Sequence, residues 1–202
     1  MASVLYAEIY LICILIVALI LFWAGRSRSN STCERRLRVM LWSFLINFTS
    51  NLLFAVFNGL WKTFPASAPF CWFFKTVYHI TLCAGIYAWC SYSEAQRPDS
   101  PFKNRKLLLL SLVPLAIPVA AVLLNLRTRA LFDFDADGYY SWGILYHFQM
   151  AYLVVGAALF SVPQVRRIPG EFDLSRKNHL ALTVSFPFCL LAAWIVSSIG
   201  EA

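Results

Sequence analysis

The sequence predicts an all-α membrane protein, a polytopic bundle of six transmembrane helices. Of the 202 residues, 60% are hydrophobic and 13% are charged, whereas an average soluble domain has about 25% charged residues. The mean hydropathy is +0.65. Apolar runs long enough to span the hydrocarbon of a bilayer also recur along the chain. Because backbone groups in lipid must be paired within their own segment, and because the alternation of a membrane β-strand is absent, each run is predicted to be a helix.

The apolar runs give the expected boundaries. The six spans occupy approximately residues 4–24, 39–61, 71–92, 107–125, 143–162 and 180–199. The fourth contains Pro114 and Pro118, and the sixth contains Pro187, so we expect kinks in both. No repeat or linker divides the chain, and residues 1–202 are therefore predicted to form one domain, without a soluble output domain.

The basic residues predict an orientation. Most Lys and Arg residues lie in the segments 25–38, 93–106 and 163–179, and few lie in the alternate connections. Since loops rich in Lys and Arg stay in the cytoplasm, both chain ends are predicted to lie outside. The net charge of +7 reflects these short loops rather than a surface that follows nucleic acid.

The cysteines and histidines do not form a recognisable metal or cofactor site. None of the six cysteines belongs to a C-x-x-C pair, so no disulfide framework or zinc site is predicted. His79 and His147 could ligate haem between two helices, but two isolated histidines favour core hydrogen bonding. No nucleophile elbow, H-E-x-x-H motif or phosphate-binding loop occurs. We therefore expect no cofactor, no metal and no enzymatic activity in this segment.

Ionisable residues at membrane depth predict a ligand site near the outer face. Such residues are costly in lipid and usually face a cavity or each other. The candidate ligand-binding residues are Glu8, Asn58, Lys75, His79, His147 and Tyr140. Together they would form an outward-facing pocket for a small polar ligand or a proton sensor. The alternative is a structural ion pair of Glu8 with Lys75, whose ammonium would reach toward the interface.

Two polar stripes lie on neighbouring spans. The residues of the first, on span 39–61, are Ser43, Asn47, Ser50, Asn51 and Asn58, and those of the second, on span 71–92, are Thr76, His79, Cys83 and Tyr87. Each stripe must point into the bundle. Helix–helix packing accounts for the first stripe more simply than a cavity lining does.

The segment 131–143 is expected to cover the ligand site. It contains D-x-D-x-D-G at 133–138, but an EF-hand loop needs a glutamate at its twelfth position, where this chain has Ile144. A turn that bends at Gly138 is therefore favoured over a surface cation site. An aromatic group of Tyr139, Tyr140 and Trp142 follows the turn.

Three stretches resemble a known family. They are LYAEIYLICILIVALILFW at 5–23, VYHITLCAGIYAWCSYSEAQ at 77–96 and LAIPVAAVLLNLRTRALFDFDADGYYSWGILYHFQMAYLVVGAAL at 115–159. The chain is similar to the seven-helix N-terminal sensory module of bacterial diguanylate cyclases with a GGDEF domain, which is related to the membrane module of some histidine kinases. The residues that match the pattern are Glu8, Trp89, Tyr92, Glu94, Phe132, Asp135, Tyr140 and Gly143.

The resemblance implies a sensory input domain in a bacterial inner membrane. It would detect a small ligand or a membrane-proximal signal and regulate a cytoplasmic, homodimeric enzyme that makes cyclic di-GMP. The seventh helix and the GGDEF motif of that family are not in this chain. The rival interpretations are a small transporter or channel, tested by flux in proteoliposomes, and an intramembrane enzyme or haem protein, tested by a Soret band. A purely structural anchor is the third.

Overall fold

The computed structural model describes residues 2–26, 31–61, 63–95 and 105–165, together with the single residues 185, 188 and 191. The chain divides into two compact units, 1–146 and 147–202. The expected span 180–199 lies outside the described residues except for those three positions. The prediction of one domain over 1–202 stays a prediction.

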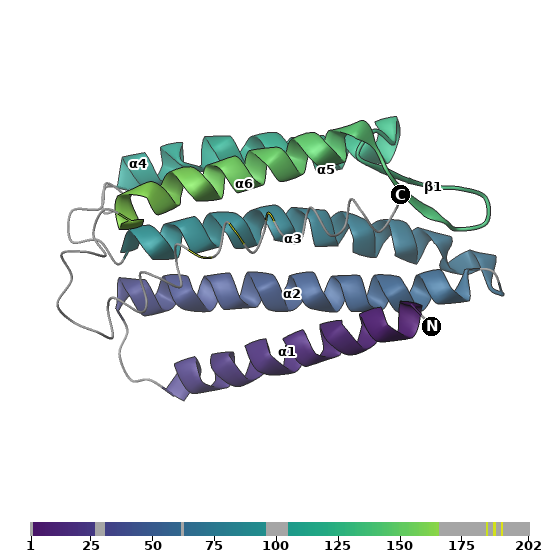
Figure 1. Ribbon diagram of the computed structural model, residues 1–202, viewed down its shortest axis with the longest axis horizontal. Coiled ribbons are helices and arrows are strands. Elements are labelled where there is room, and N and C mark those ends of the chain that lie inside the picture. Colours follow the sequence, from purple (N-terminus) through teal and green to yellow (C-terminus); the bar gives the residue numbers. More distant parts are fainter. Residues whose placement is uncertain are drawn as a thin grey trace. The chain divides into compact units, whose positions relative to one another are not determined.

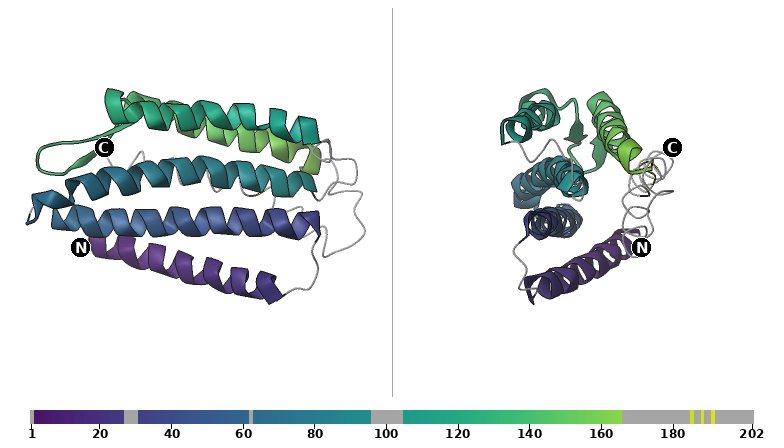
Figure 2. Two further views of the ribbon diagram at one scale, coloured as in Figure 1. Left: turned by 180° about the vertical axis from the view of Figure 1, so that it is seen from behind. Right: turned by 90° about the vertical axis from the view of Figure 1, so that its left-hand side faces the viewer.

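Helices make up most of the described chain. The long ones are α1 (Ala2–Arg26), α2 (Thr32–Leu60), α3 (Ala68–Ala95), α5 (Leu112–Thr128) and α6 (Ile144–Val165). Two short ones, the 3-10 helix η1 (Pro65–Ser67) and the helix α4 (Arg105–Leu110), precede α3 and α5. In the first unit α1 packs against α2, α2 against α3, and α3 against α5. Figure 1 shows α1, α2 and α3 side by side, and the end view in Figure 2 shows α3 between α2 and α5.

The prediction of six transmembrane helices is not supported. Three described helices are long and apolar enough to cross a membrane, at Ala7–Arg26, Thr32–Leu60 and Ile144–Val162. The helix α5 is apolar but has only 17 residues. The helix α3 has 28 residues but is not among the three. It buries several polar side chains, because a helix enclosed by neighbours does not need an apolar surface on every side.

The apolar surface of the described helices is compatible with a membrane protein. Large hydrophobic side chains on α1, among them Leu15, Leu19 and Trp23, are more than half exposed. Similar residues are exposed on α2, α5 and α6. Contiguous apolar surface of this extent marks an interaction with lipid or protein. The coarse assignment to a membrane therefore agrees with the structure.

The start of α2 differs from the prediction. The segment 25–38 was expected to be a loop, but α2 begins at Thr32. The Ser31 side chain accepts a hydrogen bond from the Glu34 backbone N–H at 3.2 Å, which is the first half of a capping box. The basic residues that follow therefore lie on the first turns of a helix. One of them, Arg36, donates to the Ser91 carbonyl at 2.9 Å, in the last turns of α3.

The predicted span 107–125 is interrupted. A turn at Ser111 separates α4 from α5. Pro114 accounts for the break, because proline has no N–H to donate to the carbonyl of Leu110 and its ring clashes with that group. The Ser111 hydroxyl lies 2.8 Å from the Tyr87 hydroxyl of α3. Pro118 is tolerated inside α5, where it is buried.

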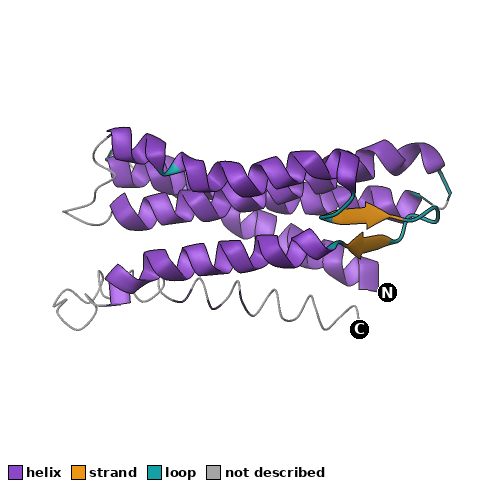
Figure 3. Cartoon of the chain, turned by 90° about the horizontal axis from the view of Figure 1, so that it is seen from above, coloured by secondary structure: helices purple, strands orange, loops and turns teal. Residues whose placement is uncertain are grey.

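A small β-hairpin replaces the expected loop at 131–143. The strands β1 (Phe132–Phe134) and β2 (Tyr140–Trp142) pair antiparallel, with Phe132 opposite Trp142 and Phe134 opposite Tyr140 (Figure 3). Because side chains alternate along a strand, these four aromatic residues share one face of the ribbon. Hairpins this short are marginal alone in water, so the ribbon depends on what that face covers.

Candidate functional site

The hairpin tip is a hydrogen-bonded turn, as the sequence indicated. One carboxylate oxygen of Asp135 accepts from the backbone N–H groups of Asp137 at 3.0 Å and Tyr139 at 2.7 Å. The Gly138 N–H donates to the Asp135 carbonyl, and Gly138 has a φ of 80°. That φ favours glycine. The D-x-D-x-D-G pattern thus serves to shape a turn, and the described residues contain no group of three or more potential metal ligands.

A buried asparagine attaches the hairpin to α5. Asn125 is 1% exposed. Its Oδ1 accepts from the Leu131 N–H at 2.6 Å and the Phe132 N–H at 3.3 Å, and its Nδ2 donates to the Phe132 carbonyl at 3.0 Å. The side chain thereby satisfies backbone groups at the point where the chain leaves α5, and it fixes the start of β1.

The Lys75 ammonium lies inside a box of aromatic rings. Its Nζ is 4.6 Å from the centroid of Phe54 on α2, 4.7 Å from that of Tyr78, 4.2 Å from that of Tyr140 and 5.5 Å from that of Trp142. A cation within about 6 Å of a ring centroid is attracted by the electrons of the ring face. Two of these rings belong to α2 and α3, and the other two belong to β2.

Further polar groups surround the box. Lys75 is 5% exposed, and its Nζ lies 3.5 Å from the Asn51 Oδ1 of α2. The buried indole N–H of Trp142 has no hydrogen-bond partner among the described residues. A buried donor of this kind normally pairs with a protein group, a water or a ligand. The box therefore combines a buried cation with an unused donor beside it.

One helical turn further on, His79 completes the centre. It is fully buried, and it stacks on Phe132 with 5.1 Å between centroids and 8° between planes. Its Nε2 lies 3.5 Å from the Tyr140 hydroxyl, and Tyr146 packs edge-on at 6.2 Å. Tyr140 therefore touches both Lys75 and His79. We call Lys75, His79 and the rings of the box the Lys75 centre.

The structure brings together three of the six predicted site residues, namely Lys75, His79 and Tyr140. Asn58 is half-buried on α2, and its Oδ1 has no partner among the described residues. Glu8 is exposed on α1, and within the described part of the chain it forms no ion pair with Lys75. His147 is exposed at the start of the second unit. The assignment of these residues to a ligand stays a prediction.

The polar stripe of α2 is used mainly for packing. The Asn47 Nδ2 donates to the Tyr78 carbonyl at 2.9 Å and to the Thr81 hydroxyl at 3.3 Å, both on α3. Ser43 and Ser50 donate to carbonyls of their own helix. The Asn47 bonds cross from α2 to α3 and agree with helix–helix packing.

Some residues of the site escaped sequence reasoning. Phe54, Phe134 and Asn125 were not singled out, and Phe54 and Phe134 look like ordinary apolar positions in a hydropathy window. Phe132 and Trp142 were noted, in the family pattern and in the aromatic group after the turn, but not as site residues. Asn125 did carry a signal, because a lone amide near the end of the apolar segment 107–125 requires a partner.

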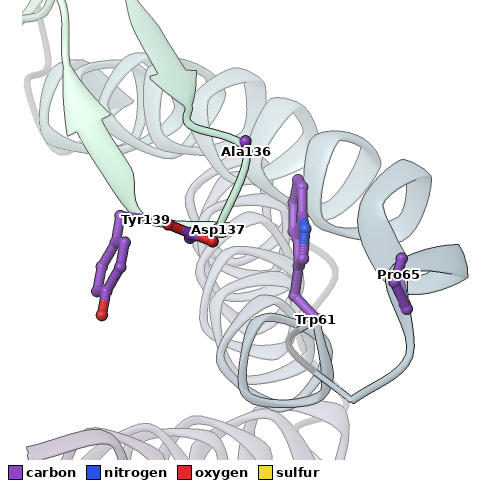
Figure 4. Close-up of a pocket in the computed structure, with 5 residues that line it drawn as sticks. All are labelled: Trp61, Pro65, Ala136, Asp137 and Tyr139. Carbon is purple, nitrogen blue, oxygen red and sulfur yellow. The ribbon is translucent and has the colours of Figure 1, made fainter.

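A pocket of about 420 Å³ lies beside the hairpin tip. Its lining residues are Trp61, Pro65, Ala136, Asp137 and Tyr139. In Figure 4 the Trp61 ring stands between Pro65 and the tip residues Ala136 and Asp137. The connection between α2 and α3 supplies one wall, and the hairpin tip supplies the other.

Comparison with protein-family models, curated proteins and solved structures finds no match to this chain. The fold and the centre together define a helical protein, compatible with a membrane, in which an aromatic hairpin closes over a buried lysine and histidine.

Proposed function

We propose that this chain is the sensory membrane domain of a bacterial signalling protein of the diguanylate cyclase type. Its N-terminus and hairpin would face outward, and its basic ends would face the cytoplasm. A small ligand or a membrane-proximal signal would act at the hairpin and regulate a cytoplasmic, homodimeric output. The domain itself would have no enzymatic activity.

The observation that carries the proposal is the burial of Lys75 beneath the hairpin. Ionisable residues at membrane depth are expensive and mark functional sites by default. Half of the box around the ammonium belongs to β2, so any displacement of the hairpin changes the surroundings of the charge. The hairpin also continues directly at Ile144 into α6, which gives a covalent route from the site to a long helix.

The distribution of charge supports the proposed orientation. Arg26, Arg35, Arg36 and Lys106 lie near the ends of α1, α2 and α4 that are remote from the hairpin in Figure 1. The hairpin carries Asp133, Asp135 and Asp137. Basic residues on one side of a bilayer are typical of the cytoplasmic side.

Replacing Lys75 with methionine is expected to change the output. Methionine keeps an apolar stem of similar length but removes the charge from the box. In the intact protein that contains this chain, cellular cyclic di-GMP should change by about twofold to thirtyfold, the range for mutations that alter coupling between sites. The membrane level of the protein, measured by immunoblot, should stay the same.

Lys106→Met is the matched control, because Lys106 is exposed on α4 and its replacement removes the same charge far from the hairpin. It should leave cyclic di-GMP unchanged. An unaltered output in Lys75→Met at normal membrane level would overturn the sensory proposal, and protein-dependent solute flux in proteoliposomes would then favour the transporter.

A further inference from the structure

We propose that the pocket at the hairpin tip binds an organic ammonium group, either as a free small cation or as the headgroup of a lipid. The assignment rests on the proposed function for its biological meaning, but the binding itself is tested separately. The group would sit over the Trp61 ring beside the Asp137 carboxylate.

The three carboxylates of the hairpin differ in what they do. Asp133 lies 3.6 Å from the Arg129 guanidinium, and its Oδ1 accepts from the Phe134 N–H. The Asp135 carboxylate holds the turn. The carboxylate of Asp137 has no hydrogen bond or ion pair in the described part of the chain, and it is the one that lines the pocket. A negative charge at the rim of a pocket attracts cations.

Trp61 gives the pocket an aromatic wall that is held in place. A Cβ on Gly138 would lie 2.6 Å from the Trp61 ring, so the turn rests directly on the indole. Phe134 packs against the same ring, with 5.5 Å between centroids. Tryptophan is the best aromatic partner for a cation, and recognition of quaternary ammonium groups is the best-known use of such rings. A fixed ring avoids the entropy cost of ordering it on binding.

The pocket is also connected to the Lys75 centre. Trp61 contacts Phe134, Phe134 contacts Tyr140 at 5.5 Å, and Tyr140 contacts the Lys75 ammonium. A ligand that moves the tip or the indole would therefore move a wall of the box through direct ring contacts. This contiguity gives the pocket a physical route to the buried charge.

The first measurement is calorimetric titration of the purified chain in a maltoside detergent, which has no ammonium group. Choline is the probe, and 3,3-dimethyl-1-butanol, its uncharged isostere, is the comparison. Both are measured at low and matched ionic strength, because exposed charge interactions are screened by salt. Choline should bind roughly threefold to tenfold more tightly than the alcohol. Equal binding of the two, or no binding of choline, would overturn the assignment.

Asp137→Asn should weaken choline binding by roughly threefold to tenfold and leave binding of the alcohol unchanged. The turn should persist, because Asp137 contributes only its backbone N–H to it. Asp133→Asn is the matched control, since it removes the same charge from the same hairpin outside the pocket lining. It should weaken choline binding less than Asp137→Asn does, because the attraction between charges falls with distance. If Asp133→Asn weakened choline binding as much as Asp137→Asn does, the overall negative charge of the hairpin would account for the attraction, and the pocket assignment would be refuted.

Lys62 follows Trp61 in the chain and lies outside the described residues. Lys62→Gln should leave choline binding intact or strengthen it. Loss of probe binding in this variant, with Asp137→Asn unaffected, would show that the pocket takes an anionic group and would overturn the proposal.

The source of the ammonium group is tested with dihexanoylphosphatidylcholine below its micellar concentration. Tighter binding than choline, with the same sensitivity to Asp137→Asn, assigns a lipid headgroup, and binding of choline alone assigns a free cation. The output assay separates the two proposals. If choline binds but the output is unaltered in Lys75→Met, the pocket assignment stands and the sensory proposal is overturned. If choline does not bind but the output changes in Lys75→Met, only the pocket assignment is overturned.

Discussion

Asn125→Leu is expected to detach the hairpin from α5. Leucine has the same branching at Cγ but leaves the Leu131 N–H, the Phe132 N–H and the Phe132 carbonyl without their side-chain partner. Each net hydrogen bond contributes about 1 kcal/mol, and an unpaired buried group costs more. The free energy of local opening should therefore fall by about 3 kcal/mol. In hydrogen–deuterium exchange, the amides of 131–143 should exchange on the order of 100-fold faster, with α1 and α2 unaffected.

Asn58→Leu provides the control. It is the same substitution at an asparagine whose Oδ1 is buried without a partner among the described residues. Removing an unsatisfied acceptor is neutral or slightly stabilising, so exchange in 131–143 should not change. If Asn125→Leu left the exchange of this segment as slow as in the wild type, the hairpin would be held by its aromatic face alone.

Asn125 and the Lys75 centre contact different parts of the hairpin. The asparagine fixes the backbone at the start of β1, whereas Lys75 and His79 contact the aromatic face formed by both strands. A ribbon this short has little stability of its own. Its position therefore depends on the contacts that Asn125 and the Lys75 centre make with it.

The apolar segments were predictable as helices because a long apolar run in lipid must pair its backbone groups within the segment, and a helix does so. The predicted span 71–92 lies within α3, and the span 4–24 lies within α1. The start of α2 was missed because a hydropathy scale assigns its arginines to a loop. The Ser31 side chain caps the helix by accepting a hydrogen bond from the Glu34 backbone N–H, which hydropathy does not count. The break at Ser111 was foreshadowed by Pro114, which was predicted to kink the segment rather than to divide it.

Among the described residues, fewer helices than predicted are long and apolar enough to span a membrane, for a related reason. Apolar length was taken as sufficient, but α5 is short after the break, and α3 carries Lys75, His79 and Glu94 in buried positions. A hydropathy window does not distinguish a helix that faces lipid from one that is enclosed by other helices. The sequence contained that distinction in the polar residues of α3.

The candidate site was predicted in part. Membrane depth, estimated from the sequence, grouped Lys75 with Glu8, Asn58 and His147, whereas Tyr140 was expected only in the covering segment 131–143. In the structure Tyr140 contacts the Lys75 ammonium. Rotation about the helix axis cannot be read from one ionisable residue, and Glu8 proves to be exposed on α1. The hairpin was missed because strands of three residues are too short for a periodicity argument. In retrospect, F-x-F and Y-x-W flanking an Asp–Gly turn are the signal.

Gly143→Ala is expected to disrupt the base of the hairpin. A Cβ at this position would overlap the carbonyl oxygen of Ala130, which is backbone and has no flexible end to move away. The same crossing is held by the Gly143 N–H to the Leu131 carbonyl at 2.9 Å and by the Leu145 N–H to the Ala130 carbonyl at 3.0 Å. Separating the two segments weakens both hydrogen bonds. The free energy of unfolding should therefore fall by about 2–3 kcal/mol, the upper part of the range for overpacking.

The measurement is unfolding by sodium dodecyl sulfate in mixed micelles, followed by far-ultraviolet circular dichroism, with Gly59→Ala as the comparison. Nothing lies within 4 Å of a Cβ on Gly59, which is in the last turn of α2. Because alanine is the better helix former, Gly59→Ala should be neutral or stabilise by up to about 1 kcal/mol. If Gly143→Ala lowers the free energy of unfolding and Gly59→Ala does not, the requirement for glycine lies in the close approach of Gly143 to Ala130. Equal effects would mean that the hairpin base adapts, and Gly143 would then have no special role in closing the site.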